Sequence, residues 1–290
     1  MPLAAGFERI PPGPKAPQWQ RRFRGREATN ASRLRATRSN GGRARSTFAL
    51  WASVTARRIR DALRGEQHPS ADDLAVIDAF RSEYVPLVVF AQVLLAGLVE
   101  VTEDSDAWRE VVPALEEQGY ERDSFLSVAS RPKTSEAIVA KLGRESTRLS
   151  QMQDIVGGRI ILPDTLLQDT ACNAIRRLTE DSQSGIELFR DVSDTREYGD
   201  EHGYRAVHVV LVVDGKPVEL QIRTAIQQAW AQLVEGLDQK FDWDLKHGQG
   251  PEDVADWLRE VSRIGALLDA GELFDDFEAR LPLRPVILDT

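Results

Sequence analysis

A carboxylate stands in the middle of an apolar run in the second half of the chain. Glu219 lies between Val218 and Leu220, and Ile222 continues the run. Burying an ionised carboxylate among aliphatic side chains is costly unless the group holds a metal ion or takes a proton. The residue type and its setting therefore indicate metal binding or general acid-base chemistry. The alternative is an edge strand whose polar face is solvated, in which Glu219 has no chemical role.

The elements that must position Glu219 are two strands joined by a tight turn. Aliphatic and β-branched residues from Ala206 to Val213 and from Pro217 to Ile222 flank the dipeptide Asp214-Gly215, which readily adopts positive φ. This pattern predicts an antiparallel hairpin. Because side chains alternate along a strand, Glu219 and Gln221 are predicted to share one face of it.

A second stretch, upstream of the hairpin, concentrates positive charge. Its members are Arg131, Lys133, Lys141, Arg144 and Arg148. The last three are spaced by three and four residues along a helix that we predict from Ser135 to Ser150, so they share one helical face. Such a face suits phosphate groups. Glu136 and Glu145 leave a plain solvated surface open as the alternative.

Two further arginines lie in or beside apolar strands. Asp154 precedes a strand that we predict from Gly158 to Leu162, Arg159 lies inside it, and Arg223 follows the last strand of the hairpin. An unpaired cation in apolar surroundings is expensive. Arg159 and Arg223 are therefore predicted to clamp phosphates or to pair with Asp154 and Glu219, which can reach the same end of the sheet. A helix-end cap is the alternative role for Asp154.

These motifs stand in an order that resembles a known family. They are Arg131-x-Lys133, Lys141-x-x-Arg144, Asp154-Ile155-x-Gly157-x-Arg159, Gly203-Tyr204-Arg205-x-x-His208 and Glu219-x-Gln221-Ile222-Arg223-Thr224. The order resembles the synthetase domain of the RelA/SpoT family, which transfers pyrophosphate from ATP to the ribose 3′-hydroxyl of GDP or GTP. The match spans Arg131 to Lys240. It implies a (p)ppGpp synthetase of the small alarmone synthetase type, acting in the stringent response.

The resemblance also implies roles for individual residues. Asp154 would be a Mg²⁺ ligand, and Glu219 would be a second ligand or the general base for the 3′-hydroxyl. The ATP site would comprise Arg131, Lys133, Lys141, Arg144, Arg148 and Arg159. The acceptor site would comprise Tyr204, stacked on the guanine, with His208, Gln221 and Arg223. Mg²⁺ is thus the expected cofactor, and ATP and GDP or GTP are the expected partners.

Departures from the family pattern concern the acceptor. The stretch from Asp194 to His202 is short and contains no lysine, and Ala137 and Ala206 replace serines. GDP or GTP remains the favoured acceptor, while an adenine nucleotide, a tRNA 3′ end or a catalytically inactive nucleotide- or RNA-binding module stays open. The histidines, His68, His202, His208 and His247, form no paired His-Asp hydrolase signature. Hydrolysis is therefore not expected.

The order of predicted elements indicates an α/β (α+β) fold. We expect a nucleotidyltransferase-like mixed sheet backed by helices, with N- and C-terminal helical elaborations. The chain divides into a basic arm (1–45), a helical N-terminal region (46–128), a synthetase domain (129–245) and a C-terminal helical region (246–290). Helices are predicted at 46–64, in one long segment from Ser70, and at 106–118, 135–150, 165–181, 224–240 and 251–277. Strands are predicted at 158–162, at 186–192 and in the hairpin.

Composition bears on partners and location. The arm holds ten arginines and Lys15 against Glu8 and Glu27, whereas the whole chain has a formal net charge of −9. Such an arm suits contact with RNA, or it is an unstructured terminus. The run from Val85 to Val101 is interrupted by Pro86, Gln92, Gly97 and Glu100, so we expect no spanning helix and no membrane partner. Cys172 is expected to be a buried structural thiol in a cytoplasmic protein. A homo-oligomer stays open.

Overall fold

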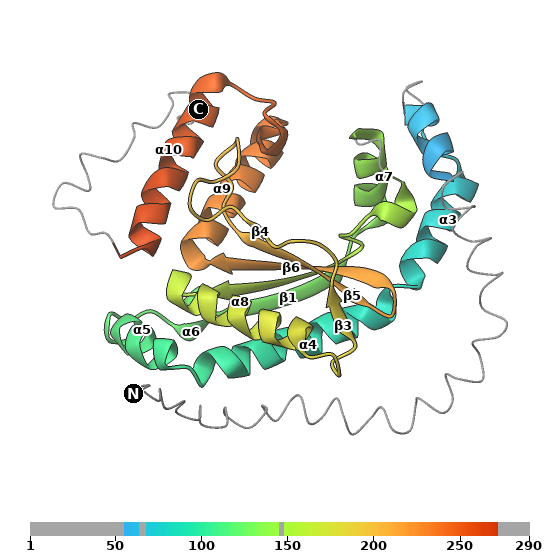
Figure 1. Ribbon diagram of the computed structural model, residues 1–290. Helices are drawn as coiled ribbons and strands as arrows, with labels where there is room; N and C mark the ends of the chain where they lie inside the picture. Colours follow the sequence, from blue (N-terminus) through green and yellow to red (C-terminus); the bar gives the residue numbers. More distant parts are fainter. Residues whose placement is uncertain (1–54, 64–67, 145–147, 272–290) are drawn as a thin grey trace, which may run out of the picture. The chain divides into compact units, whose positions relative to one another are not determined.

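The computed structural model describes residues 55–63, 68–144 and 148–271, all within one compact unit that begins at Phe48. The basic arm, the first part of the helix predicted at 46–64 and the end of the region predicted at 251–277 lie outside the described residues. A six-stranded sheet is the centre of the fold (Figure 1). Its strands are β1 (Ser127–Pro132), β2 (Val156–Leu162), β3 (Ile186–Leu188), β4 (Ser193–Asp194), β5 (Val207–Val213) and β6 (Lys216–Thr224).

The strands lie in the order β1-β2-β6-β5-β3, and β4 pairs with β5. β2 pairs with β6 in parallel, and the other strand pairs are antiparallel. The predicted mixed sheet is therefore confirmed. The hairpin of β5 and β6 is confirmed as well. Asp214 and Gly215 have φ angles of 52° and 73°, because the type I′ turn needs positive φ at both central residues.

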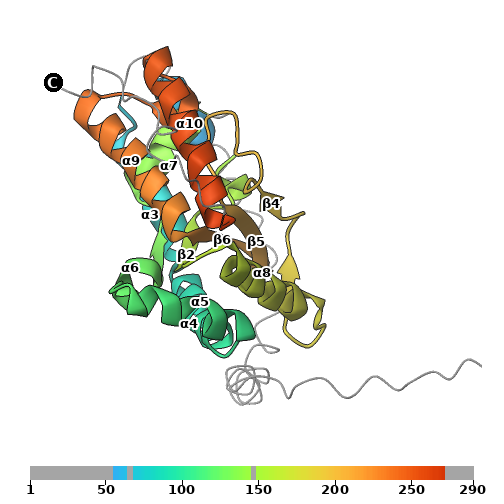
Figure 2. The same ribbon diagram turned by 90° about the vertical axis from the view of Figure 1, so that its left-hand side faces the viewer.

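Helices cover both faces of the sheet (Figures 1 and 2). Residues 55–63 are helical. The longer helices are α3 (Ala71–Ser82), α4 (Val85–Glu103), α5 (Asp106–Glu117), α7 (Ser135–Arg144), α8 (Thr165–Glu180), α9 (Ala225–Phe241) and α10 (Glu252–Asp269). Short helical turns are α6 (Arg122–Phe125), η2 (Leu149–Gln151) and η3 (Leu245–His247). α4 and α8 pack against one face, below the sheet in Figure 1, and α9 lies on the other.

The face toward α4 is apolar and closely packed. Alternate residues of β2 are buried, as expected for a strand with one covered face. A Cβ atom at Gly158 would lie 2.8 Å from Leu220 and 3.2 Å from Leu95 of α4. Glycine at this position therefore lets the helix approach the sheet, and a larger residue would push the two apart.

The long helix predicted from Ser70 is two helices. Ser70 does cap the first one, because its hydroxyl accepts from the backbone N–H of Asp73 at 3.2 Å. α3 ends at Ser82, however, and α4 begins at Val85. Pro86 explains the break, since proline lacks the N–H that would continue the preceding helix and suits the first turn of a new one.

The elements around Arg131 differ from the predicted ones. Arg131 and Pro132 end strand β1, which the sequence did not predict. The helix predicted from Ser135 to Ser150 ends at Arg144, and Arg148 has an extended backbone with φ −90° and ψ 149°. Arg148 therefore does not share a helical face with Lys141.

The other element predictions hold with smaller changes. The helices predicted at 106–118, 165–181 and 224–240 are confirmed as α5, α8 and α9. The strand predicted at 186–192 is shorter: β3 covers three residues and β4 follows it.

In α8, burial raises the pKa of the Cys172 thiol to about 11, so this cysteine keeps its proton at neutral pH.

Helix α4 is, by length and composition alone, long and apolar enough to cross a membrane. The expectation of no such segment is therefore wrong on those two criteria. One such helix is weak support for a membrane span, since core helices pass the same test. α4 contacts β1, β2 and α8 and buries Leu87, Leu94 and Leu98. Packing against the sheet accounts for these buried residues, whereas Val85, Val89 and Val93 of the same helix are exposed.

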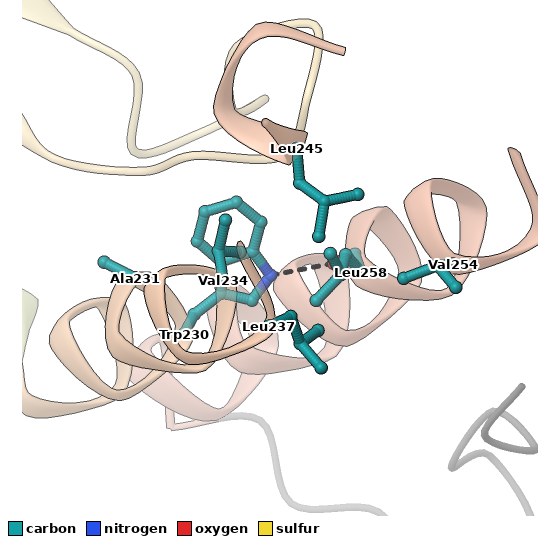
Figure 3. Packing of buried hydrophobic residues seen from close by; sticks show 7 residues of the cluster. All are labelled: Trp230, Ala231, Val234, Leu237, Leu245, Val254 and Leu258. Carbon is teal, nitrogen blue, oxygen red and sulfur yellow. Dashed lines mark hydrogen bonds between the residues drawn. The ribbon is translucent and has the colours of Figure 1, made fainter. Parts of the chain in front are cut away.

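A separate apolar cluster joins α9 to α10 (Figure 3). Its members are Trp230, Ala231, Val234, Leu237, Leu245, Val254 and Leu258. The indole N–H of Trp230 donates to the carbonyl oxygen of Leu258 at 2.8 Å, so the one polar atom of this ring is satisfied inside the cluster. The cluster fixes α10 against α9, which extends directly from β6.

Asp269, at the end of α10, is a buried carboxyl group whose charge is poorly compensated. Thr224 Oγ1 donates to its Oδ2 at 2.6 Å, and Oδ1 has no hydrogen-bond partner among the residues described. Burial raises the pKa of Asp269 to about 6. The folded state therefore binds the Asp269 proton more tightly than the unfolded state does. The stability that this proton adds is present below pH 4 and is lost as the pH rises through 6.

We expect Asp269→Asn to remove this pH dependence. Asparagine can still accept from Thr224, so the wild type should lose roughly 3 kcal/mol of unfolding free energy relative to the variant between about pH 4 and pH 7. Urea denaturation of both proteins across this range measures the difference. If the unfolding free energies of the two proteins change in parallel with pH, burial does not raise the pKa of Asp269.

Candidate active site

One face of the sheet carries a row of polar side chains. Arg159 of β2 lies opposite Gln221 of β6, which in turn lies opposite His208 of β5. Glu219 precedes Gln221 by two residues and therefore shares its face, as predicted. The alternate residues of β6 are buried toward the other face. The polar row thus lies on the side of the sheet away from α4 and α8, where α9 lies (Figure 1).

Asp154 lies between two lysines, just before β2. Its Oδ2 accepts from Lys133 Nζ at 2.6 Å and from Lys141 Nζ at 3.1 Å. Burial alone would raise the pKa of Asp154, but the hydrogen bond and charge of Lys133, together with those of Lys141, outweigh it and hold the pKa below its usual value. The carboxylate is therefore ionised at neutral pH, and it binds lysines rather than a helix end.

Glu219 is the end of a hydrogen-bonded chain of three side chains. Its Oε1 lies 3.1 Å from His208 Nδ1, and His208 Nε2 lies 2.7 Å from the hydroxyl of Tyr204. Burial and the nearby charge of Asp154 raise the pKa of Glu219, but the hydrogen bond and charge of His208 outweigh them and lower it. Glu219 and Asp154 are thus close enough to interact, and each is neutralised by its own partner.

The donors in this chain follow from the charges. An ionised Glu219 can only accept, so His208 donates to it from Nδ1. Burial raises the pKa of Tyr204 against the opposing effect of Arg223, so the phenol keeps its proton. The same oxygen accepts from Arg223 Nη2 at 2.6 Å. The Tyr204 hydroxyl thus joins Arg223 to His208.

Arg223 is a buried cation held by neutral groups. Its Nη1 donates to Gln228 Oε1 at 2.8 Å, and its Nη2 donates to Gln221 Oε1 at 3.0 Å and to Tyr204. Arg159 donates from Nε to the same Gln221 oxygen at 3.3 Å. Gln221 therefore holds two guanidinium groups side by side.

Neither guanidinium pairs with Asp154 or Glu219. Within 55–63, 68–144 and 148–271, Arg159 and Arg223 form no ion pair, because Lys133 and His208 take the carboxylates. The expectation that the arginines pair with these carboxylates is therefore wrong. Phosphate binding by Arg159 and Arg223 is the other predicted role, and it stays a prediction. Burial and the charge of Arg223 lower the pKa of Arg159. Two neighbouring guanidinium groups, each without a carboxylate in ion-pair contact in the described part of the chain, favour the binding of an anion.

The surroundings of Tyr204 limit how a base can stack on it. The guanidinium of Arg223 lies over its ring, 4.9 Å from the ring centroid, and the ring meets His208 edge-on and Trp230 at a tilt. A base stacked on this ring would therefore have to use the face that Arg223 does not cover. The predicted proximity of Tyr204 and His208 is observed.

The remaining cations of the predicted ATP site lie at its rim. Arg131, Arg144 and Arg148 are exposed. Arg131 pairs in register with Gly157, which pairs in turn with Glu219, and its charge contributes to the lowered pKa of Arg159. Arg131 therefore adjoins the polar row, whereas Arg148 lies beyond the end of α7.

Two residues of α9 belong to the site and were not predicted. Gln228 holds Arg223, and the charge of Glu235 acts on Arg159 and Arg223. The sequence held a weak signal for Gln228, a polar residue at a buried position one helical turn after Arg223. The sequence held no signal for Glu235, because the position of Glu235 beside the sheet depends on how α9 packs.

The residues present fit a magnesium ion. Oδ1 of Asp154 is buried and has no hydrogen-bond partner in the described part of the chain, so it can accept a ligand. No group of three or more His, Cys, Asp or Glu side chains that could hold a metal occurs within the described ranges. Magnesium does not need one, since it is commonly bound by one or two carboxylates together with substrate phosphates and water.

Comparisons with known proteins define the family. A family model described as "Region found in RelA / SpoT proteins" matches residues 130–246, which contain every motif named above. The GTP pyrophosphokinase YjbM of Bacillus subtilis is 31% identical over 161 residues, which cover 49% of this chain and 67% of YjbM. The chain belongs to the RelA/SpoT family.

Other relatives cover less or are more distant. An uncharacterised protein of Mycobacterium tuberculosis is 31% identical over 152 residues, which cover 52% of this chain and 53% of that protein. The chain thus spans about half the length of this curated relative. The crystal structure of small alarmone synthetase 1 from Bacillus subtilis bound to its product pppGpp has a TM-score of 0.48 and 24% identity, covering 67% of this chain and 94% of that one.

Proposed function

We propose that the chain is an ATP-dependent, Mg²⁺-requiring pyrophosphokinase that transfers the β,γ-pyrophosphate of ATP to the 3′-hydroxyl of GDP or GTP, making (p)ppGpp. The domain division, the cytoplasmic location and the role in the stringent response belong to this proposal. The GTP pyrophosphokinase activity in the name of YjbM supports the choice of a guanine acceptor.

The observation that carries the proposal is the separation of charges on one sheet face. Asp154 and Glu219 are each neutralised by their own partner, while Arg159 and Arg223 have no carboxylate in ion-pair contact among the described residues. Nε of Arg223 is also buried there without a hydrogen-bond partner. The site therefore offers a carboxylate oxygen for a metal ion and cations for phosphates, the two requirements of phosphoryl transfer.

In the proposed reaction the 3′-oxygen of the acceptor attacks the β-phosphorus of ATP. The bond from that phosphorus to the α–β bridging oxygen breaks, and AMP leaves with the electron pair. Glu219 takes the proton of the 3′-hydroxyl, and His208 holds it ionised beforehand. Because a base with a lowered pKa is a weak one, Glu219 acts mainly through its position.

The phosphate groups are bound by the cations around Asp154. Lys133, Lys141 and Arg159, with Arg131, Arg144 and Arg148 at the rim, would bind ATP. Bound magnesium, held by Asp154, would supply charge neutralisation at the transferred phosphates. The alternative role of Glu219, in place of the base, is that of a second magnesium ligand. Tyr204, His208, Gln221 and Arg223 would bind the acceptor.

Incubation of the purified full chain with labelled ATP, Mg²⁺ and an acceptor tests this proposal. We expect AMP and a 3′-pyrophosphorylated product with GDP or GTP, and little product with ADP, ATP or deacylated tRNA. Label appearing only on tRNA, and lost on removal of residues 1–45, would instead indicate an RNA-modifying enzyme that uses its basic arm. Nucleotide binding without AMP release under any condition would show that the protein is a catalytically inactive binding module.

A further inference from the structure

The segment that leads into β5 is bonded to the C-terminal helix. This segment, residues 195–204, is called the acceptor loop here because it ends at Tyr204. Arg205, directly after it, donates from Nε to Ser262 Oγ of α10 at 2.9 Å. Ser262 Oγ in turn donates to the carbonyl oxygen of Gly203. Arg205 and Ser262 are only 7% and 5% exposed, so water does not compete for these bonds.

The other end of the Arg205 side chain holds the start of the same loop. Its Nη1 donates to the carbonyl oxygens of Arg196 and Glu197, the latter at 2.6 Å. One guanidinium thus connects the beginning of the acceptor loop to a residue of α10. Within the ranges described, Arg205 has no ion-pair partner, so its hydrogen bonds are to neutral oxygens.

Close packing adds to these bonds. Gly203 has a φ of 94°, and a Cβ atom there would lie 3.2 Å from the Cα of Arg259 and 3.3 Å from the Cβ of Ser262. The backbone of the loop therefore touches the backbone of α10 directly. Inside the loop, the N–H groups of His202 and Tyr204 both donate to Asp200 Oδ1 at 2.9 Å, and these bonds stabilise the end of the loop.

Tyr204 lies between the two residues that α10 holds. Gly203 before it is bonded to Ser262, and Arg205 after it is bonded to Ser262 and to the start of the loop. The Tyr204 hydroxyl must meet both Arg223 and His208, which requires a fixed backbone. A second bond from α10, between Asp269 and Thr224, fixes the strand end next to Arg223.

We propose that Arg205 and Ser262 are positioning residues of the acceptor site, through which α10 holds the acceptor loop so that Tyr204 reaches Arg223 and His208. This inference rests on the proposed function. Its consequence is that α10, which packs against α9 rather than against the sheet, determines how well the acceptor nucleotide is bound. α10 contributes little to the use of ATP.

Three variants and one matched control test the inference in the full chain. Ser262→Ala and Arg205→Met remove the bonds, and Arg205→Lys keeps a cationic donor that can reach part of them. Thr102→Val is the control. Thr102 is buried, as Arg205 and Ser262 are, and its hydroxyl donates to the carbonyl oxygen of Leu98 within α4, away from the acceptor loop. The control therefore also loses one buried hydrogen bond. Melting temperature is measured for all four.

We expect the KM for GDP or GTP to rise about tenfold in Ser262→Ala and further in Arg205→Met, with partial recovery in Arg205→Lys. The KM for ATP and kcat should stay within about threefold of the wild type. Amide hydrogen exchange at Gly203 and Tyr204 should become faster in these variants and not in Thr102→Val.

A purely structural role predicts a different pattern. Lower melting temperatures with unchanged acceptor KM, or equal losses in both substrates, would overturn the inference. Unchanged amide exchange in the loop would do the same. An inactive wild type that binds no nucleotide contradicts the proposed function instead, so the two failures are distinguishable.

Discussion

Replacement of Glu219 by glutamine is expected to lower kcat by at least about 100-fold, the usual range for loss of a general base. The amide has the same shape and can still accept a hydrogen bond from His208 Nδ1, which now lies 3.1 Å from the carboxylate. It cannot take a proton. The fold should therefore persist while proton removal from the 3′-hydroxyl is lost.

Single-turnover rates with saturating ATP and acceptor measure this effect without contributions from product release. Glu187→Gln is the matched control, because Glu187 lies in β3 of the same sheet, is exposed and has no part in the polar row. Its rate should equal that of the wild type. A Glu219→Gln rate within a few-fold of the wild type would falsify the assignment of the base.

The part of the site that the sequence predicted best depends on local pattern. Alternation along β6 places Glu219 and Gln221 on one face, and the Asp214-Gly215 turn sets the register that brings His208 beside them. These relations span few residues and follow from strand geometry, so a pattern of residue types is enough to find them.

The sequence failed where structure depends on pairing partners. Strand β1 contains serine, arginine and proline and is largely exposed, so neither alternation nor propensity marks it. It is a strand because the outer edge of β2 needs hydrogen-bond partners, and Pro132 is tolerated at its end. Lys133 then follows the strand end, which is why it reaches Asp154.

Contacts between distant helices were invisible for the same reason. Ser262 on α10 faces the residues before β5 because Trp230 and its neighbours pack α10 against α9. The residue type of Ser262 carries no sign of this. Serine in the middle of an amphipathic helix usually faces solvent or its own backbone.

Replacement of Asp154 by asparagine is expected to remove the dependence of ATP binding on Mg²⁺ and to lower kcat by at least about 100-fold. Asp154 supplies the buried oxygen that has no hydrogen-bond partner in the described residues, and a neutral amide is a much weaker ligand for a hard cation. Lys133 and Lys141 would also lose their anionic partner, so the variant should be slightly less stable without nucleotide.

Titration of a non-hydrolysable ATP analogue into each protein, with Mg²⁺ and with a chelator, measures this linkage. The wild type should bind the analogue more tightly with Mg²⁺, and Asp154→Asn should bind it equally under both conditions. Binding in the chelator should not weaken in the variant, because removing a carboxylate from a phosphate site reduces repulsion and frees two lysines. Asp191→Asn, an exposed position, is the control and should behave like the wild type. A variant that retains the full effect of Mg²⁺ would place the metal elsewhere and leave Asp154 as a structural partner of the two lysines.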